Sequence, residues 1–391
     1  MTTKRPRPSQ FVILADESAN WRIAGLCQLE RIVLAINEWT ETAETGSTIE
    51  LVVLWRPSIP SADRRLPDCR KVDHVRWTES TNAVRGEARV LSTRLLLERN
   101  GLGVFLEATK TVETEEGGSA SSWGQWFDEF EQSCRAGKGS EIGWRFLAGP
   151  GDSEAGEREF LSRLGKSQDG VVSRLINRPI SRFVTRLLLR YSIHPTAWTL
   201  AILVLPLLSF ALLVRGAYFS IVLGALLFQL FSILDGCDGE MARARYLESA
   251  RGARLDYLCD LSGNVLFVAG LGFGLGWRNG LYAWEGIFCA AFIITNEVLL
   301  GFSHDHDQPA PPGLMPTLYP RHRGMIQNSG LAVLGETFVA WLMQLTKRDV
   351  SVLAFLVLAL IGLPQWILHL WTAVAGASLA LAGIAAARTR S

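Results

Sequence analysis

Residues 233–264 read ILDGCDGEMARARYLESARGARLDYLCDLSGN, a charged stretch that stands between two long apolar segments and decides the fold. Residues 216–234 before it and residues 261–277 after it contain no charged side chain. A helix that crosses a bilayer needs about 20 mostly apolar residues. We therefore expect two membrane-spanning helices here, joined at the membrane surface by the charged stretch.

The rest of the C-terminal half follows the same pattern, with short charged islands between apolar runs. Including the two runs above, six spans are predicted, and the other four are residues 195–214, 280–302, 350–368 with a break at Pro364, and 371–387. Residues 331–345 are also apolar, but Glu336 and the charged residues 347–349 favour an interfacial segment over a seventh span. This pattern excludes a wholly soluble enzyme.

Basic residues predict how these spans are oriented. The loops after the first, third and fifth spans hold only Arg215 and Arg278, whereas the opposite side carries most of the basic residues of this half. Short cytoplasmic loops are enriched in Lys and Arg, so we expect both termini and the charged stretch to be cytoplasmic, in an inner or plasma membrane. Across the chain 39 Lys and Arg balance 38 Asp and Glu, which gives no reason to expect nucleic-acid binding.

Four aspartates in the charged stretch fall on two predicted helix faces. Asp235 and Asp238 are three residues apart at the end of one span, and Asp256 and Asp260 are four residues apart at the start of the next. Clustered carboxylates repel one another unless cations lie between them, and oxygen ligands without His or Cys suit Mg²⁺, Mn²⁺ or Ca²⁺. The spacing predicts a divalent-metal site. The alternative is a loop that only caps the two helices by ion pairing.

Small residues and one arginine accompany the aspartates. Gly239, Ala242 and Gly252 lack bulk, so a ligand can approach the two helix backbones there. Arg243 adds a fixed positive charge that can pair with a phosphate. Together with the carboxylates, these residues predict a site for a metal-bound diphosphate.

The stretch resembles the signature of the CDP-alcohol phosphotransferase family, D-x2-D-G-x2-A-R-x8-G-x3-D-x3-D. Every fixed position of that signature is present: Asp235, Asp238, Gly239, Ala242, Arg243, Gly252, Asp256 and Asp260. The resemblance implies a six-helix membrane domain. It also implies transfer of a substituted phosphate from a CDP-alcohol to an acceptor hydroxyl, with release of CMP.

The resemblance further implies a role for each of these residues. Two divalent cations, Mg²⁺ or Mn²⁺ with Ca²⁺ able to substitute in binding, would be held by Asp235, Asp238 and Asp256, with Asp260 completing the cluster. Asp260 would also be the general base for the acceptor hydroxyl. The CDP pocket would be lined by Asp235, Gly239, Ala242, Arg243, Gly252 and Asp256. Members of the family are usually homodimers.

Residues 163–193 are expected to form a juxtamembrane segment. Within it, residues 165–170 and 173–181 resemble the corresponding segment of one branch, the di-myo-inositol phosphate phosphate synthases, which join CDP-inositol and inositol phosphate. Apolar residues recur at helical spacing in this segment with arginines between them, which predicts an amphipathic interfacial helix. Arg178 or Arg254 is then expected to bind the acceptor phosphate. Thr196 stands where the family usually has Asn, a departure that concerns the branch and not the core chemistry.

Residues 1–162 are expected to form a cytosolic mixed α/β domain before this segment and before the membrane domain, residues 194–391. Short apolar runs predict strands at residues 11–14 and 49–54, with a helix over 26–39 between them. Residues 89–106 are expected to hold another helix and strand.

The order of these elements resembles a nucleotidyltransferase, but the residues that carry its chemistry are missing. Residues 16–20, DESAN, stand where that family has a Gly-rich phosphate loop and a basic residue, and carboxylates there would repel a phosphate. The later segment 143–150 also lacks the metal-site pattern. The domain is therefore predicted to be a degenerate, inactive cytidylyltransferase-like domain.

Two alternatives to a polyol-phosphate transferase remain at this point. A phospholipid synthase would use the same site with CDP-diacylglycerol or a CDP-linked head group. A non-enzymatic membrane scaffold or a transporter belongs to another class; a transporter typically has polar breaks in the middle of its spans and an internal repeat. The juxtamembrane segment favours a polar acceptor such as inositol phosphate.

Overall fold

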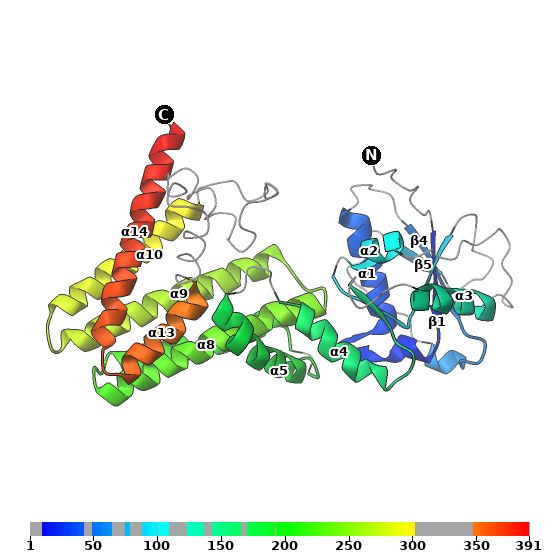
Figure 1. The fold of residues 1–391 in the computed structure, drawn as a ribbon, viewed down its shortest axis with the longest axis horizontal. Coiled ribbons are helices and arrows are strands. Elements are labelled where there is room, and N and C mark those ends of the chain that lie inside the picture. The colour runs from blue at the N-terminus through cyan, green and yellow to red at the C-terminus, as the bar shows by residue number, and fades with distance from the viewer. Residues whose placement is uncertain are drawn as a thin grey trace. The chain divides into compact units, whose positions relative to one another are not determined.

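A computed structural model describes residues 10–42, 49–64, 75–78, 88–99, 101–108, 123–136, 143–165, 170–191, 193–301 and 347–390 (Figure 1). The segment expected to be interfacial, 331–345, lies outside these residues. The chain forms two compact units, Met1–Leu164 with Arg243–Tyr246, and Gly165–Ala242 with Leu247–Ser391. Along the sequence, the long segment of the first unit ends at Leu164 and the second unit begins at Gly165. The boundary predicted from the sequence follows residue 162.

The first unit is built on a four-stranded parallel sheet. Its strand order is β5 (Val75–Thr78), β4 (Ile49–Trp55), β1 (Gln10–Ala15) and β6 (Ala88–Ser92). In the centre of the sheet β1 pairs with both β4 and β6, so Val12 lies opposite Val52 on one side and Val90 on the other. The two predicted strands, 11–14 and 49–54, are confirmed, and the mixed α/β class of this unit with them.

Helices cover both faces of this sheet, because its side chains alternate between two apolar clusters. Phe11 and Ile13 belong to the cluster formed with α1 (Gln28–Thr42) and α2 (Gly101–Ala108). Val12 and Leu14 instead pack with Trp123 and Trp126 at the beginning of α3 (Trp123–Ala136). The unit therefore has three layers, with the strands between α1 and α3 (Figure 1).

The first unit also contains several smaller elements. They are two 3-10 turns, η1 (Glu17–Asn20) and η2 (Ser61–Asp63), the paired strands β2 (Arg22–Ile23) and β3 (Leu26–Cys27), the paired strands β7 (Leu95–Leu97) and β8 (Trp144–Phe146), and helix α4 (Asp152–Arg163). The helix expected from residue 26 begins two residues later, because residues 26–27 pair as β3. Residues 89–106 contain two strands and a helix, since apolar runs this short fit either structure.

The second unit is helical. A π-helical turn, η6 (Ser173–Asn177), leads into α5 (Arg178–Leu188), and the chain continues through α6 (Pro195–Ile202), α7 (Val204–Leu213), α8 (Tyr218–Ala244), α9 (Ala250–Gly276), α10 (Leu281–Gly301), α13 (Arg348–Leu360) and α14 (Pro364–Arg390). Among the described residues, Pro195–Leu213, α8 and α9 are long and apolar enough to cross a membrane. Each of the other predicted spans also coincides with helix, and their crossing of the membrane stays a prediction.

Prolines explain where these helices differ from the predicted spans. The first span is interrupted at Leu203, because Pro206 has no N–H to donate to the carbonyl of Ile202. The fifth run ends at Leu360, and Gly362 follows with a positive φ of 79°. Since Pro364 begins α14, the sixth helix starts seven residues before the span predicted from residue 371.

Aromatic rings and close glycines hold the helices of this unit together. Phe228 of α8 stacks on Phe267 of α9 at 4.3 Å between ring centroids, and Phe355 of α13 stacks on Trp371 of α14 at 4.8 Å. Between α9 and α10 the backbones approach so closely that a Cβ on Gly272 would lie 2.7 Å from the Cα atom of Gly286. These contacts pack α8, α9, α10, α13 and α14 together, and the signature lies at the ends of α8 and α9.

Candidate functional site

The signature occupies the C-terminal end of α8 and the N-terminal end of α9. Ser249 caps α9, since its hydroxyl accepts a hydrogen bond from the backbone N–H of Gly252 at 3.1 Å. The helices pack closely just beyond this point, where a Cβ on Gly263 would lie 2.9 Å from the ring of Phe231. The fixed ends of two packed helices thereby carry the four predicted ligand aspartates.

Asp235 of α8 and Asp260 of α9 share one cationic partner, Arg348. The guanidinium Nη1 atom of Arg348 contacts Asp260 Oδ1 and lies 3.4 Å from Asp235 Oδ2. Its guanidinium also lies over the ring of Phe231, 5.2 Å from the centroid. Because one guanidinium contacts both, the carboxylates of Asp235 and Asp260 point towards each other across α8 and α9.

Asp238 is held in a different direction, towards α6. Its Oδ2 atom accepts a hydrogen bond of 2.5 Å from the hydroxyl of Thr199, and both side chains are buried. The negative charges of Asp238, Asp256 and Asp260 all act on Asp235, so the four carboxylates form one electrostatic cluster. Within the described part of the chain, Arg348 supplies a positive charge that faces Asp235 and Asp260.

The donor set fits a hard divalent cation in its chemistry. All four side chains offer carboxylate oxygens, and Asp235 Oδ1 is buried without a hydrogen-bond partner among the described residues. As the side chains are placed, no three acidic, His or Cys groups in the described part of the chain enclose a metal position. A cation bound here would therefore require Asp238 to turn away from Thr199 or Arg348 to move aside.

The other signature residues lie in two settings. Gly239 and Ala242 are half-buried on α8 and Gly252 is half-buried on α9, so their backbones remain partly accessible. Arg243 groups with the first unit, where its Nε atom donates a hydrogen bond of 2.8 Å to the carbonyl of Leu164. The predicted contact of Arg243 with a phosphate stays a prediction.

Arg178, one of the two arginines expected at the acceptor phosphate, is buried against Glu240. Its Nη1 atom lies 2.9 Å from Glu240 Oε1, and Glu240 also accepts hydrogen bonds from Ser181 at 2.9 Å and Thr185 at 2.7 Å. Gly236 permits this approach, because a Cβ there would lie 2.9 Å from Arg178 Nη1. The Glu240 carboxylate thus ties α5 to α8. Arg254, the other arginine, is exposed on α9.

The amphipathic helix predicted here is present, with its polar face turned inward. Arg178, Ser181 and Thr185 are buried, whereas Leu175 and Phe183 are 73% and 74% exposed. These exposed apolar side chains continue from η6 into α5 on the side opposite Glu240. A helix whose outer face is apolar suits a lipid environment.

Three residues of the site were missed by reasoning from the sequence. Glu240 falls on a variable position of the signature, and Thr199 and Arg348 come from other helices. Arg348 is placed by its neighbour Asp349, whose carboxylate accepts a hydrogen bond of 2.6 Å from the backbone N–H of Ser173. The only sequence signal for Arg348 was its place in a charged island at the start of an apolar run.

Comparison with known proteins gives this helical domain a class. Residues 192–310, which include α6 to α10 and the whole signature, match the model of the family described as CDP-alcohol phosphatidyltransferase. This part of the chain is therefore a CDP-alcohol phosphatidyltransferase domain. The match agrees with the apolar helices and identifies a membrane protein.

The curated relatives carry one name, "Bifunctional IPC transferase and DIPP synthase". The protein of Rubrobacter xylanophilus is 34% identical over 203 residues, 49% of this chain and 45% of the relative. That of Archaeoglobus fulgidus is 38% identical over 119 residues, 30% of this chain and 23% of the relative, and that of Aquifex aeolicus is 29% identical over 233 residues, 59% and 47%. The matches span less than half the length of each relative. They support the branch predicted from the juxtamembrane segment.

Proposed function

We propose that this protein transfers a substituted phosphate from a CDP-alcohol to an acceptor alcohol and releases CMP, in a divalent-metal-dependent reaction at the membrane surface. The observation that supports it is the cluster of Asp235, Asp238, Asp256 and Asp260 at the ends of α8 and α9, with the full signature spacing. Two of these carboxylates contact one cationic group, so a cation can be held between them.

Each residue has a role in this proposal. The four aspartates hold the cations, which when bound neutralise the diphosphate and the CMP leaving group. Asp260 accepts the proton of the attacking hydroxyl. Asp235, Asp256, Gly239, Ala242, Arg243 and Gly252 bind the CDP part of the donor.

The acceptor in this proposal is a polar polyol phosphate such as inositol phosphate. The juxtamembrane segment and the name of the relatives support this choice. Because Arg178 is paired with Glu240, the exposed Arg254 is the better placed of the two predicted arginines to contact the acceptor phosphate. A long cationic side chain is suited to a doubly charged phosphate.

The proposal includes the setting of the reaction. The six predicted helices lie in the inner or plasma membrane, with both termini and the aspartate cluster on the cytoplasmic side. The chain acts as a homodimer. The first unit is a cytidylyltransferase-like domain without transferase activity, in which residues 16–20 replace the phosphate loop.

A substrate panel tests the reaction. The full-length protein in detergent with Mg²⁺ or Mn²⁺ is expected to release CMP from CDP-inositol in the presence of inositol phosphate. The proposed site has ligands for the metal that binds the diphosphate, and the proposed acceptor is a polyol phosphate. CMP is measured by chromatography for every pairing of CDP-inositol, CDP-glycerol and CDP-diacylglycerol with inositol phosphate, glycerol phosphate and free polyols.

Two controls give this panel its meaning. Asp256→Ala serves as the blank, and a chelator is expected to stop CMP release by the unmodified protein. Release only from CDP-diacylglycerol would contradict the polyol acceptor and place the protein among phospholipid synthases. Activity of the isolated first unit on CTP and a polyol phosphate would contradict its proposed inactivity.

Arg348→Gln tests how the cluster admits cations. Arg348 faces Asp235 and Asp260 with a positive charge, so a metal ion must displace it or share these carboxylates with it. We expect Mn²⁺ to bind the variant about 10-fold more tightly, a change of about 1.4 kcal/mol, measured by electron paramagnetic resonance without substrate.

The controls for this variant keep or remove charge elsewhere. Arg348→Lys retains the positive charge and is expected to give an intermediate affinity. Arg278→Gln removes an exposed arginine after α9 and is expected to leave Mn²⁺ binding unchanged. Equal or weaker Mn²⁺ binding by Arg348→Gln would show that Arg348 does not compete with the cation.

A further inference from the structure

A single carboxylate stands near the C-terminal end of α10. Residues 291–301 of this helix read AFIITNEVLLG, and Glu297 is the only charged side chain among them. A charged group inside a predicted span is costly in lipid, and such residues typically face the interior of the helical domain and have a binding or catalytic role. The contacts of Glu297 therefore indicate what it does.

A hydrogen bond directs Glu297 towards α9. Its Oε2 atom accepts a hydrogen bond of 2.5 Å from the hydroxyl of Tyr257, and Glu297 is half-buried. The two helices run in opposite directions, because Gly272 near the end of α9 lies against Gly286 near the start of α10. The C-terminal end of α10 thus lies beside the N-terminal end of α9, where the second half of the signature begins.

Tyr257 belongs to the same part of α9 as the signature aspartates. Residues three or four apart on a helix are neighbours on its surface, about 5–6 Å apart at their Cβ atoms. Tyr257 therefore has Arg254 as a neighbour on one side and Asp260 on the other. Arg254 is exposed and Tyr257 is 37% exposed, so this row of side chains is accessible to a ligand.

Asp260 stands between two helices that neighbour α9. On the side of α8, Asp260 and Asp235 contact the guanidinium of Arg348, and the rest of the signature on α8 is proposed to bind the donor. On the side of α10, the next residue of the row, Tyr257, contacts Glu297. The proposed base must touch the attacking hydroxyl, so the acceptor is expected beside Asp260 on the side of α10.

Glu297 and Tyr257 offer the groups that recognition of hydroxyls requires. A carboxylate accepts hydrogen bonds from hydroxyl groups, and such charge-assisted bonds are roughly twice as strong as neutral ones. A phenol both donates and accepts. A carboxylate repels a phosphate, whereas Arg254, one turn away, attracts it. A polyol phosphate matches this pattern, with its hydroxyls at Glu297 and its phosphate at Arg254.

We propose that Glu297, held by Tyr257, determines the specificity of the acceptor site by binding hydroxyl groups of a polyol phosphate whose phosphate lies at Arg254. This inference rests on the function proposed above and adds recognition of the acceptor's hydroxyls to it. Inositol phosphate carries more hydroxyls than glycerol phosphate, so the loss of Glu297 affects inositol phosphate more.

Steady-state kinetics of the full-length protein in detergent test this role. In Glu297→Gln, the KM for inositol phosphate is expected to rise at least about 10-fold, because a hydrogen bond to a charged group is lost. The KM for glycerol phosphate should rise less. The KM for CDP-inositol is expected to stay within about 2-fold, which a general loosening of the helices would not allow. Mn²⁺ binding, measured by electron paramagnetic resonance, should not change.

Hydrogen–deuterium exchange provides a readout that does not depend on turnover. Inositol phosphate is expected to slow exchange in peptides that cover residues 254–260 and 293–298 of the unmodified protein, and to do so less in Glu297→Gln. If the unmodified protein shows this protection but releases no CMP with any acceptor, the proposed reaction fails while the acceptor site stands. Absence of protection at both segments would overturn the site.

Matched variants separate recognition from structure. Tyr257→Phe removes one hydroxyl and is expected to raise the KM for inositol phosphate less than Glu297→Gln, and it provides the test if Glu297→Gln does not fold. Glu297→Asp retains the carboxylate and should recover part of the affinity. Glu285→Gln and Tyr282→Phe, also on α10, are expected to leave both KM values unchanged. An unchanged KM for inositol phosphate, or an equal rise for CDP-inositol, would overturn the proposal.

Discussion

Asp260→Asn is expected to lower turnover by at least about 10³-fold while CDP still binds within a few-fold of the original affinity. The amide has nearly the shape of the carboxylate but cannot accept a proton from the acceptor hydroxyl, and general-base catalysis contributes roughly 10²–10⁴-fold. The substitution also removes the negative charge that faces Arg348. CMP release measures turnover, and calorimetry with CDP and Mn²⁺ measures binding.

The interpretation depends on variants that separate charge from position. Glu285→Gln changes an acidic residue on α10 that is hydrogen-bonded to His369, and it is expected to keep turnover within a few-fold. Asp260→Glu retains a base and should recover part of the activity. If Asp260→Asn turns over at more than a tenth of the original rate, Asp260 is not the base; if CDP binding is lost instead, its role is in binding.

Glu240→Ala is expected to destabilise the helical unit by about 3–5 kcal/mol. The change removes the carboxylate that pairs with the buried guanidinium of Arg178 and that accepts hydrogen bonds from Ser181 and Thr185. Removing one partner of a buried ion pair costs this much because the other charge stays buried. Thermal unfolding in detergent measures the loss, and hydrogen exchange of residues 173–188 shows whether α5 detaches.

A double-mutant cycle is the sharper form of this test. Arg178→Leu with Glu240→Leu removes both charges and replaces them with apolar side chains. We expect the double variant to be more stable than either Arg178→Leu or Glu240→Leu alone, since each single change leaves one buried charge without the other member of the pair. Additive losses in the double variant, or unchanged exchange in α5 after Glu240→Ala, would show that the pair does not hold α5 to α8.

The sequence was most informative where a regular apolar pattern was bounded clearly by polar residues. Strands β1 and β4 and the positions of the apolar helices followed from apolar runs bounded by polar residues. The spacing of the signature predicted which aspartates share a helix, and the ligand roles of these residues stay predictions. Helix ends were less well predicted. A run such as 350–368 does not reveal that its helix already ends at Leu360, before Gly362 and Pro364.

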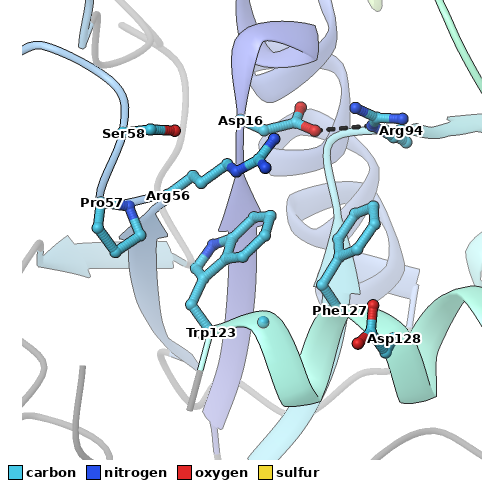
Figure 2. A pocket seen from close by; sticks show the side chains of 9 residues that line it. Asp16, Arg56, Pro57, Ser58, Arg94, Trp123, Phe127 and Asp128 are labelled. Atoms are coloured by element: carbon cyan, nitrogen blue, oxygen red, sulfur yellow. Dashed lines mark hydrogen bonds and ion pairs between the residues drawn. The ribbon is translucent and has the colours of Figure 1, made fainter. Parts of the chain in front are cut away.

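The partners of the aspartates could not be predicted because they come from distant parts of the chain. Thr199 and Arg348 meet α8 and α9 only after the helices pack, and no local pattern marks them. The same holds for Asp16, whose pairing with Arg94, 78 residues away, no local pattern indicated (Figure 2). Local spacing predicts which residues share a helix face, whereas tertiary packing decides which partners their polar groups contact.

Helix α5, whose polar side chains are buried and whose apolar side chains are exposed, has a practical consequence for anyone who modifies this protein. Ordinary solubility engineering replaces exposed leucines and phenylalanines with charged residues. Applied to Leu175 and Phe183, it would remove the exposed apolar side chains that suit a lipid environment, while the buried polar side chains of Arg178, Ser181 and Thr185 would stay in place. On this helix the exposed apolar side chains should be kept, and the buried polar side chains help to hold the helix in place.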